Sequence, residues 1–165
     1  MRAVSGTGPQ VGTGGYLPRK MDHIAIMDKK RKFLEKILSG EKTIESRWYV
    51  TKRVPWDRIK AGETIYFKES GNPVAAKATV SEVMQFYLPQ TNIAELLEKH
   101  GKAIGFKPEK FPETVEWCKK RKYCILVRLK EVQKITPFNI DKKGFGMMAA
   151  WITVEDISHL RLSCS

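Results

Sequence analysis

The sequence predicts a single α+β domain built on a small antiparallel β-barrel with flanking helices. The chain has 165 residues, 42% of them hydrophobic, which suits one core and leaves little room for two. Its middle consists of short runs of β-forming residues separated by turns that contain glycine or proline, the pattern of an antiparallel meander. Segments with apolar residues at helical spacing lie between these runs.

We expect the domain to cover residues 21–157. Residues 1–20 are rich in glycine, serine and threonine and contain no acidic residue, which is typical of a flexible tail. This tail is a basic arm, a cloning remnant or an upstream reading of a gene that starts at Met21. Residues 158–165 are expected to form a C-terminal extension.

The first predicted elements are a strand over residues 23–27 and a helix over residues 28–39. Asp28 can cap the start of this helix, and Gly40 stands where a left-handed residue commonly ends one. The apolar residues of the helix recur on one face: Phe33, Leu34, Ile37 and Leu38. Residues 29–32 are all basic, and they form either a grip for phosphate or the solvated face of the helix.

Residues 43–49 alternate like a strand. Thr43, Glu45 and Arg47 therefore share one face, and Ile44 lies on the other. Lys42 precedes them at the turn, near the end of the charged face. Two further strands are expected over residues 64–67 and 74–86, the second one bent, with a turn at residues 70–73 between them.

Two helices are expected in the second half of the chain. Asn92 and Glu95 form a capping-box pattern that begins a helix ending near Gly101 or Gly105, and a shorter helix covers residues 113–121. We expect both to pack as an insertion on one side of the barrel. Residues 123–132 alternate strongly and predict the next strand.

The end of the domain has two glycines around an aromatic residue, at positions 144–146, followed by Trp151 and a short strand over residues 152–154. Phe145 and Trp151 either form a lip of a binding cleft or plug the end of the barrel, since aromatic residues are most often buried.

Gly40, Lys42, Glu45 and Arg47 form the pattern G-x-K-x-x-E-x-R between a helix and a strand. This pattern resembles the signature of the ASCH domain family, whose members have a small PUA-like β-barrel of mixed and antiparallel strands. The resemblance covers about residues 21–157. It implies a module that binds RNA or a nucleotide in a cleft lined by the signature residues.

The chemistry of these side chains agrees with such a cleft. Arg47 offers a planar fork for phosphate or a guanine edge, Lys42 a mobile positive charge, and Glu45 an acceptor for an exocyclic amine. A tryptophan can stack on an unpaired base, and the candidates are Trp48, Trp56 and Trp151. The alternative is that Glu45 forms an internal ion pair with Lys42 or Arg47 that holds the start of the strand.

The family also contains enzymes, so catalysis by Lys42 and Glu45 stays open. A ribonuclease would use Glu45, Lys42 and Arg47 without a metal. Family members that resemble acetylcytidine amidohydrolases pair the lysine with a threonine and a glutamate, but here Glu45 replaces the threonine and Ile104 the glutamate. A protein-interaction module is the third alternative, and a protein partner would need an exposed apolar patch.

The net charge of +12 favours nucleic acid as the partner over an anionic membrane. No apolar run reaches the length of a membrane-spanning helix, and no secretory signal is evident, so we expect a soluble, cytoplasmic monomer. The three cysteines and three histidines lack metal-ligand spacing, so we expect neither a metal nor another cofactor.

Limited proteolysis tests the predicted domain boundaries. The first 20 residues lack the apolar groups needed to offset the roughly 1–2 kcal/mol per residue that ordering a backbone costs. We expect cleavage to trim the chain to near Lys20 and leave residues 21–157 as one cooperative unit. A tail that survives conditions that cut exposed loops would contradict this boundary.

Overall fold

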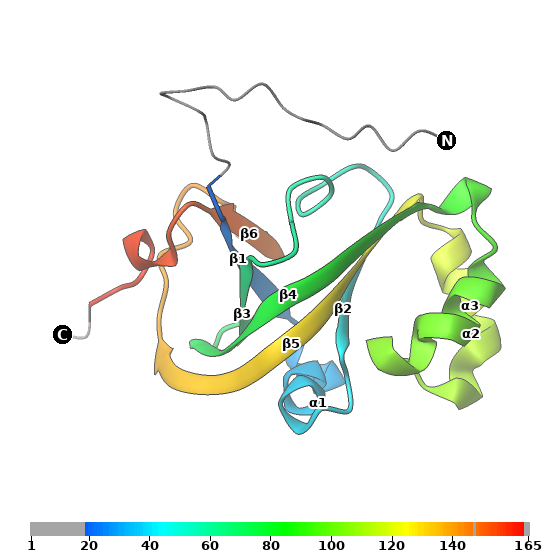
Figure 1. Ribbon diagram of the computed structural model, residues 1–165, viewed down its shortest axis with the longest axis horizontal. Helices are drawn as coiled ribbons and strands as arrows, with labels where there is room; N and C mark the ends of the chain where they lie inside the picture. Colours follow the sequence, from blue (N-terminus) through cyan, green and yellow to red (C-terminus); the bar gives the residue numbers. More distant parts are fainter. Residues whose placement is uncertain (1–18, 147, 164–165) are drawn as a thin grey trace, which may run out of the picture.

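The computed structural model describes residues 19–163, apart from Met147. Within these residues, six strands form one curled sheet in the order β2-β5-β4-β3-β1-β6 (Figure 1). The strands are β1 (Asp22–Met27), β2 (Ile44–Tyr49), β3 (Thr64–Glu69), β4 (Val74–Tyr87), β5 (Tyr123–Phe138) and β6 (Trp151–Val154). β1 pairs with β3 in parallel, and the other neighbours are antiparallel. The predicted α+β barrel-like fold, with mixed and antiparallel strands, is therefore confirmed.

Two long strands give the sheet its curl. β4 and β5 pair from Val74 opposite Phe138 to Tyr87 opposite Tyr123, and their register shifts at several points along this pairing. Such irregularities bend a strand and increase its twist, which agrees with the bend predicted for residues 74–86. β5 continues past the predicted end at residue 132, because its polar second half keeps pairing with the beginning of β4.

The helix α1 (Phe33–Ser39) is shorter than the predicted helix over residues 28–39. The carboxylate of Asp28 accepts a hydrogen bond from the backbone nitrogen of Lys30, but it caps only a 3₁₀ turn over Lys29–Arg31. Lys32 then takes a positive φ of 55°, which interrupts the helical path. Gly40, at φ 83°, ends α1 as expected.

The helices α2 (Ile93–Ile104) and α3 (Phe111–Lys119) lie together beside β2, as the insertion predicted on one side of the barrel (Figure 1). Asn92 caps α2 by accepting from the backbone nitrogen of Glu95 at 3.1 Å. A separate apolar cluster joins both helices to the outer face of β2 and β5. Its buried members are Ile44, Leu88, Ile93, Leu96, Leu97, Ile104, Cys118, Cys124 and Leu126.

The main core fills the inside of the curl. Phe67, Ile65 and Ile125 are fully buried there, and Trp151 closes one side of the cluster. A third cluster joins β1 and β6 to the C-terminal 3₁₀ turn (Ile157–His159). Trp151 is only 4% exposed, which agrees with the plug alternative for this residue.

A buried polar cluster connects β1, β6 and the segment before β3. His23 is fully buried, and its Nε2 lies 2.9 Å from Glu63 Oε1. The indole nitrogen of Trp151 donates to His23 Nδ1 at 3.2 Å, and the Thr153 hydroxyl lies 3.0 Å from the same nitrogen. Because Nδ1 accepts from Trp151, the imidazole is neutral with its proton on Nε2.

Burial lowers the pKa of His23, and the hydrogen bond to Glu63 opposes this shift without cancelling it. The unfolded chain therefore binds a proton at His23 at a higher pH than the folded chain. We expect the free energy of unfolding to fall as the pH drops below about 6.5, by at most about 1.4 kcal/mol per pH unit from this group.

Urea denaturation between pH 5 and 8 measures this contribution. His23→Gln should flatten the pH dependence below pH 6.5, and the part that remains should include His100, whose pKa is also lowered by burial. Identical pH profiles for the wild-type protein and His23→Gln would show that His23 does not titrate differently on folding.

Candidate nucleotide-binding site

The signature segment is held where the sheet meets the helical insertion. The backbone nitrogen of Lys42 donates to the carbonyl of Lys36 in α1, and that of Thr43 donates to the carbonyl of Ala103 in α2. Among the described strands, β2 then runs along the edge of the sheet and pairs only with β5. The predicted alternation is present, with Ile44 packed among the helices and Glu45 and Arg47 on the opposite face.

Lys42 is buried, with only 1% of its surface exposed. Its ammonium donates to the main-chain carbonyls of Ile44, at 2.7 Å, and of Ile104. The same nitrogen lies 4.6 Å from the centre of the Phe33 ring and 4.0 Å from Glu45 Oε2. Burial lowers the pKa of Lys42, and the carboxylate of Glu45 opposes that shift. Lys42 therefore lies beneath the surface of the site, next to the carboxylate of Glu45.

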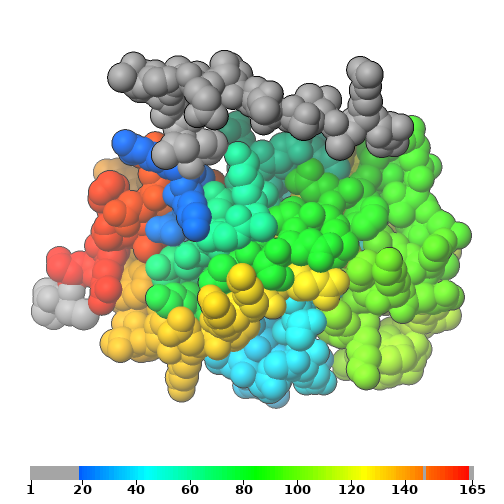
Figure 2. All heavy atoms as spheres, viewed as in Figure 1, coloured from blue at the N-terminus to red at the C-terminus, as the bar shows by residue number. Residues whose placement is uncertain are grey.

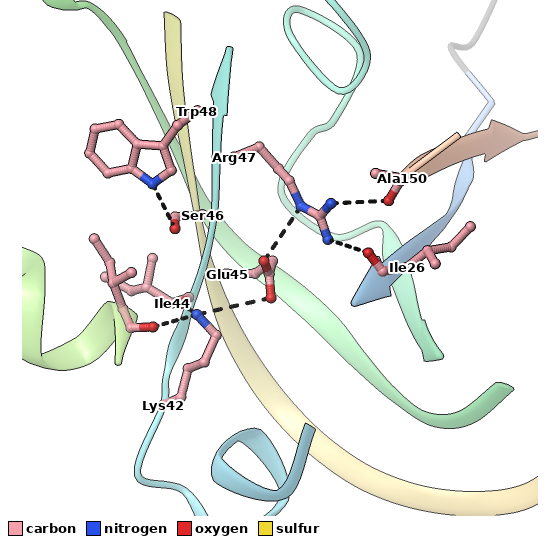
Figure 3. Close-up of polar contacts among 9 residues, drawn as sticks. Ile26, Lys42, Ile44, Glu45, Ser46, Arg47, Trp48 and Ala150 are labelled. Carbon is pink, nitrogen blue, oxygen red and sulfur yellow. Dashed lines mark hydrogen bonds and ion pairs between the residues drawn. The ribbon is translucent and has the colours of Figure 1, made fainter. Parts of the chain in front are cut away.

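Arg47 connects the two outer edges of the curled sheet. Its terminal nitrogens donate to the carbonyl of Ala150, just before β6, and to the carbonyl of Ile26 in β1, at 3.1 and 3.3 Å (Figure 3). Its guanidinium carbon lies 5.2 Å from the centre of the Trp151 ring. β2 and β6 are the two edge strands of the sheet. The hydrogen bonds of Arg47 therefore connect one edge strand to the strand and segment at the opposite edge.

Glu45 lies between these two cations. Its Oε1 is 3.5 Å from Arg47 Nε, and its Oε2 is 4.0 Å from Lys42 Nζ. The internal ion pairs that the sequence offered as an alternative are therefore both present. Across the described part of the chain, the only buried side-chain polar atoms without a hydrogen-bond partner are Glu45 Oε2 and Arg47 Nε.

A cavity of about 420 Å³ opens in front of Glu45 and Arg47. Glu45 and Arg47 form its charged floor, and Tyr49 continues the same face of β2. Trp48 stands in an aromatic wall with Trp117 and Phe106, at ring-centre distances of 6.1 Å to each. The remaining lining residues come from β1, β2, the α1 region and the segment before β6: Ile26, Met27, Asp28, Arg31, Phe33, Ser46 and Ala150.

Two of the aromatic candidates lie elsewhere. Phe145 is 38% exposed on its glycine-flanked turn and does not line this cavity. Trp56 packs edge-to-face on Tyr123, with ring centres 5.1 Å apart, beside the main core. Trp151 reaches the site only through its contact with Arg47. The lining therefore includes Glu45, Arg47 and Trp48 from the predicted set, but not Lys42, Phe145 or Trp151.

Sequence reasoning missed Tyr49, Phe106 and Trp117. Tyr49 had a usable signal, because it follows Glu45 and Arg47 at the period of two that places residues on one face of a strand. Burial raises the pKa of Tyr49, so its hydroxyl keeps its proton and can donate a hydrogen bond. Phe106 and Trp117 had no such signal, since their position depends on how the helical insertion docks.

The described residues contain no cluster of three or more histidine, cysteine, aspartate or glutamate side chains placed to hold a metal ion. Cys118 and Cys124 are both buried, and burial raises the pKa of the Cys118 thiol to about 12, so this thiol stays protonated. In the same part of the chain, no helix is long and apolar enough to cross a bilayer.

No family model and no curated protein match the sequence. Solved structures are similar in fold. The ASCH protein from Zymomonas mobilis superposes with a TM-score of 0.57 at 17% identity, over 79% of this chain and 85% of that one. A serine-to-alanine mutant of that protein superposes with a TM-score of 0.58 at 19% identity, over 82% of this chain and 89% of the mutant. The chain therefore has the ASCH-type, PUA-like α+β fold that its G-x-K-x-x-E-x-R segment led us to expect.

Proposed function

We propose that this protein is an ASCH-type module that binds RNA or a nucleotide in the cavity in front of Glu45 and Arg47. The observation that carries the proposal is the carboxylate of Glu45, which is 4% exposed, lines the cavity and leaves one oxygen without a hydrogen-bond donor. A buried acceptor without a donor costs about 1–3 kcal/mol, so a ligand that supplies an N–H group is favoured there.

A nucleobase has the groups that this cavity lacks. Its exocyclic amine can donate to the carboxylate of Glu45, and its flat face can stack on Trp48 or on a neighbouring aromatic side chain. The volume of about 420 Å³ lies within the usual range of small-molecule sites. The net charge of +12 adds a positive field that attracts phosphate. Base, stacking surface and charge therefore point to the same class of ligand.

The three charged signature residues have different roles in this proposal. Glu45 contacts the base. Arg47 lines the cavity, and each of its terminal nitrogens donates one hydrogen bond to a main-chain carbonyl, that of Ala150 or of Ile26, so each keeps a second N–H group. Lys42 is a positioning residue, since its hydrogen bonds to Ile44 and Ile104 fix the start of β2 and place its charge behind Glu45.

Cleavage of RNA without a metal is a second candidate, and the position of Glu45 favours it. Glu45 would take the proton of a ribose 2′-hydroxyl, the 2′-oxygen would attack phosphorus, and the bond to the 5′-oxygen would break as that oxygen takes a proton from solvent. The acetylcytidine amidohydrolase alternative has less support, because Ile104 offers Lys42 a main-chain oxygen where that chemistry needs a carboxylate.

Glu45→Gln tests the binding proposal, since it keeps the shape of the side chain and removes its charge. Binding of mixed-sequence single-stranded RNA, and of the four mononucleotides, should weaken by about 1–3 kcal/mol, the range of hydrogen bonds to charged groups. The matched control is Glu82→Gln, which neutralises a half-exposed carboxylate paired with Arg128 on the surface. Titrations followed by fluorescence anisotropy or calorimetry measure both. Equal affinities for Glu45→Gln and Glu82→Gln would refute the proposed site.

Lys42→Met separates binding from catalysis. The change leaves two buried carbonyls without a donor and Glu45 without one of its cations, so we expect the free energy of unfolding to fall by about 1–3 kcal/mol. Affinity of the folded variant for RNA should stay close to that of the wild-type protein, because Lys42 does not line the cavity.

The same variant is then tested for turnover of a labelled single-stranded RNA and of acetylcytidine. Cleavage by the wild-type protein that disappears in Lys42→Met while binding persists would show that Lys42 takes part in catalysis. In that case Lys42 is a catalytic residue and the assignment as a purely positioning residue is wrong.

A further inference from the structure

A second cavity of about 470 Å³ adjoins the first. It lies between the turn before α1 on one side and the insertion of α2 and α3 on the other, and the two cavities share four lining residues: Arg31, Phe33, Phe106 and Trp117. In Figure 2 the α1 region (cyan) lies against the helical insertion (light green) on the lower side of the molecule. The two cavities are therefore adjacent, and these four residues lie between them.

The second cavity is strongly basic. Its lining carries a single carboxylate, Glu113, against five cations: Lys30, Arg31, Lys36, Lys107 and Lys110. In the described part of the chain none of these five cations forms an ion pair. Arg31 and Lys36 instead stand 5.7 and 5.9 Å from the centre of the Phe33 ring. Their charges are therefore available to an anion that enters the second cavity.

These cations come from two separate segments of the chain, whereas the charges of an ordinary solvated helix face come from one helix. Lys30 and Arg31 belong to the turn before α1, whereas Lys107 and Lys110 flank the turn that begins α3, and only the tertiary fold brings the two segments together. Like charges repel, so gathering them around one hollow is unfavourable for the protein alone. A ligand with several negative charges relieves that repulsion.

We propose that the two adjacent cavities together form one groove that holds a single-stranded oligonucleotide, with one base in the cavity of Glu45 and the adjoining phosphates on the cations of the second cavity. The inference rests on the proposed function and names its substrate class. A mononucleotide would fill the first cavity and leave the second unused. A duplex is disfavoured, because its stacked and paired bases cannot enter an aromatic-walled cavity.

The experiment compares ligands of different length at several salt concentrations. The ligands are mononucleotides, mixed-sequence RNAs of two, four and eight nucleotides, and an eight-base-pair duplex. The variant Lys107→Ala/Lys110→Ala removes two exposed cations of the second cavity. Its control, Lys130→Ala/Lys134→Ala, removes two exposed cations from β5 outside both cavities, so the change in net charge is the same.

For the wild-type protein we expect affinity to rise from one to four nucleotides and to exceed that for the duplex. Lys107→Ala/Lys110→Ala should lose this gain with length, leave mononucleotide affinity unchanged, and reduce the slope of log K against log salt by about 1.4, from roughly 0.7 per phosphate contact in single strands. The control variant should keep the gain with length and most of the slope.

Two results would overturn the inference in distinguishable ways. In the first, mononucleotides bind and Glu45→Gln weakens their binding, but affinity does not depend on oligonucleotide length or the two double variants behave alike. The second cavity then does not bind the phosphates of the ligand, although the proposed function stands. If neither mononucleotides nor oligonucleotides bind the wild-type protein, the proposed function fails and the inference fails with it.

Discussion

The bridge made by Arg47 is the interaction on which the rest of the site depends. A curled sheet that does not close leaves two edges, and here β2 and β6 are those edges. Arg47 crosses the opening, donating to the carbonyls of Ile26 and Ala150 and stacking near Trp151. Ile26, Arg47 and Ala150 all line the cavity, so the cavity lies directly beside this bridge.

The buried charges of the signature lie next to charges of opposite sign. A buried ammonium or carboxylate costs several kcal/mol unless it is paired and hydrogen-bonded. Lys42 meets this requirement with two main-chain carbonyls, and Glu45 meets it only in part, between two cations at 3.5 and 4.0 Å. The structural ion pair and the proposed binding site are therefore compatible. The same arrangement leaves Glu45 in the lining of the cavity, with one carboxylate oxygen that has no hydrogen-bond donor.

The helical insertion adds aromatic side chains to the cavity in front of β2. Without α2 and α3, Trp48 would lack the aromatic partners Phe106 and Trp117, and the basic turn before α1 would face open solvent. A shared fold does not determine function, because function depends on the side chains that the fold places together. In this chain those side chains are a carboxylate, a cluster of aromatic rings and a set of cations without ion-pair partners among the described residues.

The sequence by itself determined the α+β class, the glycine stop after α1 and the face shared by Glu45 and Arg47. These features follow from local rules, because a positive φ at Gly40 and a period of two along β2 are properties of the chain over a few residues. The tertiary structure alone decided that Lys42 is buried rather than exposed, that Trp151 supports Arg47 from the core, and that two distant basic segments meet. Burial and docking depend on contacts between residues far apart in the chain, such as that of Lys42 with Ile104, and no local pattern encodes them.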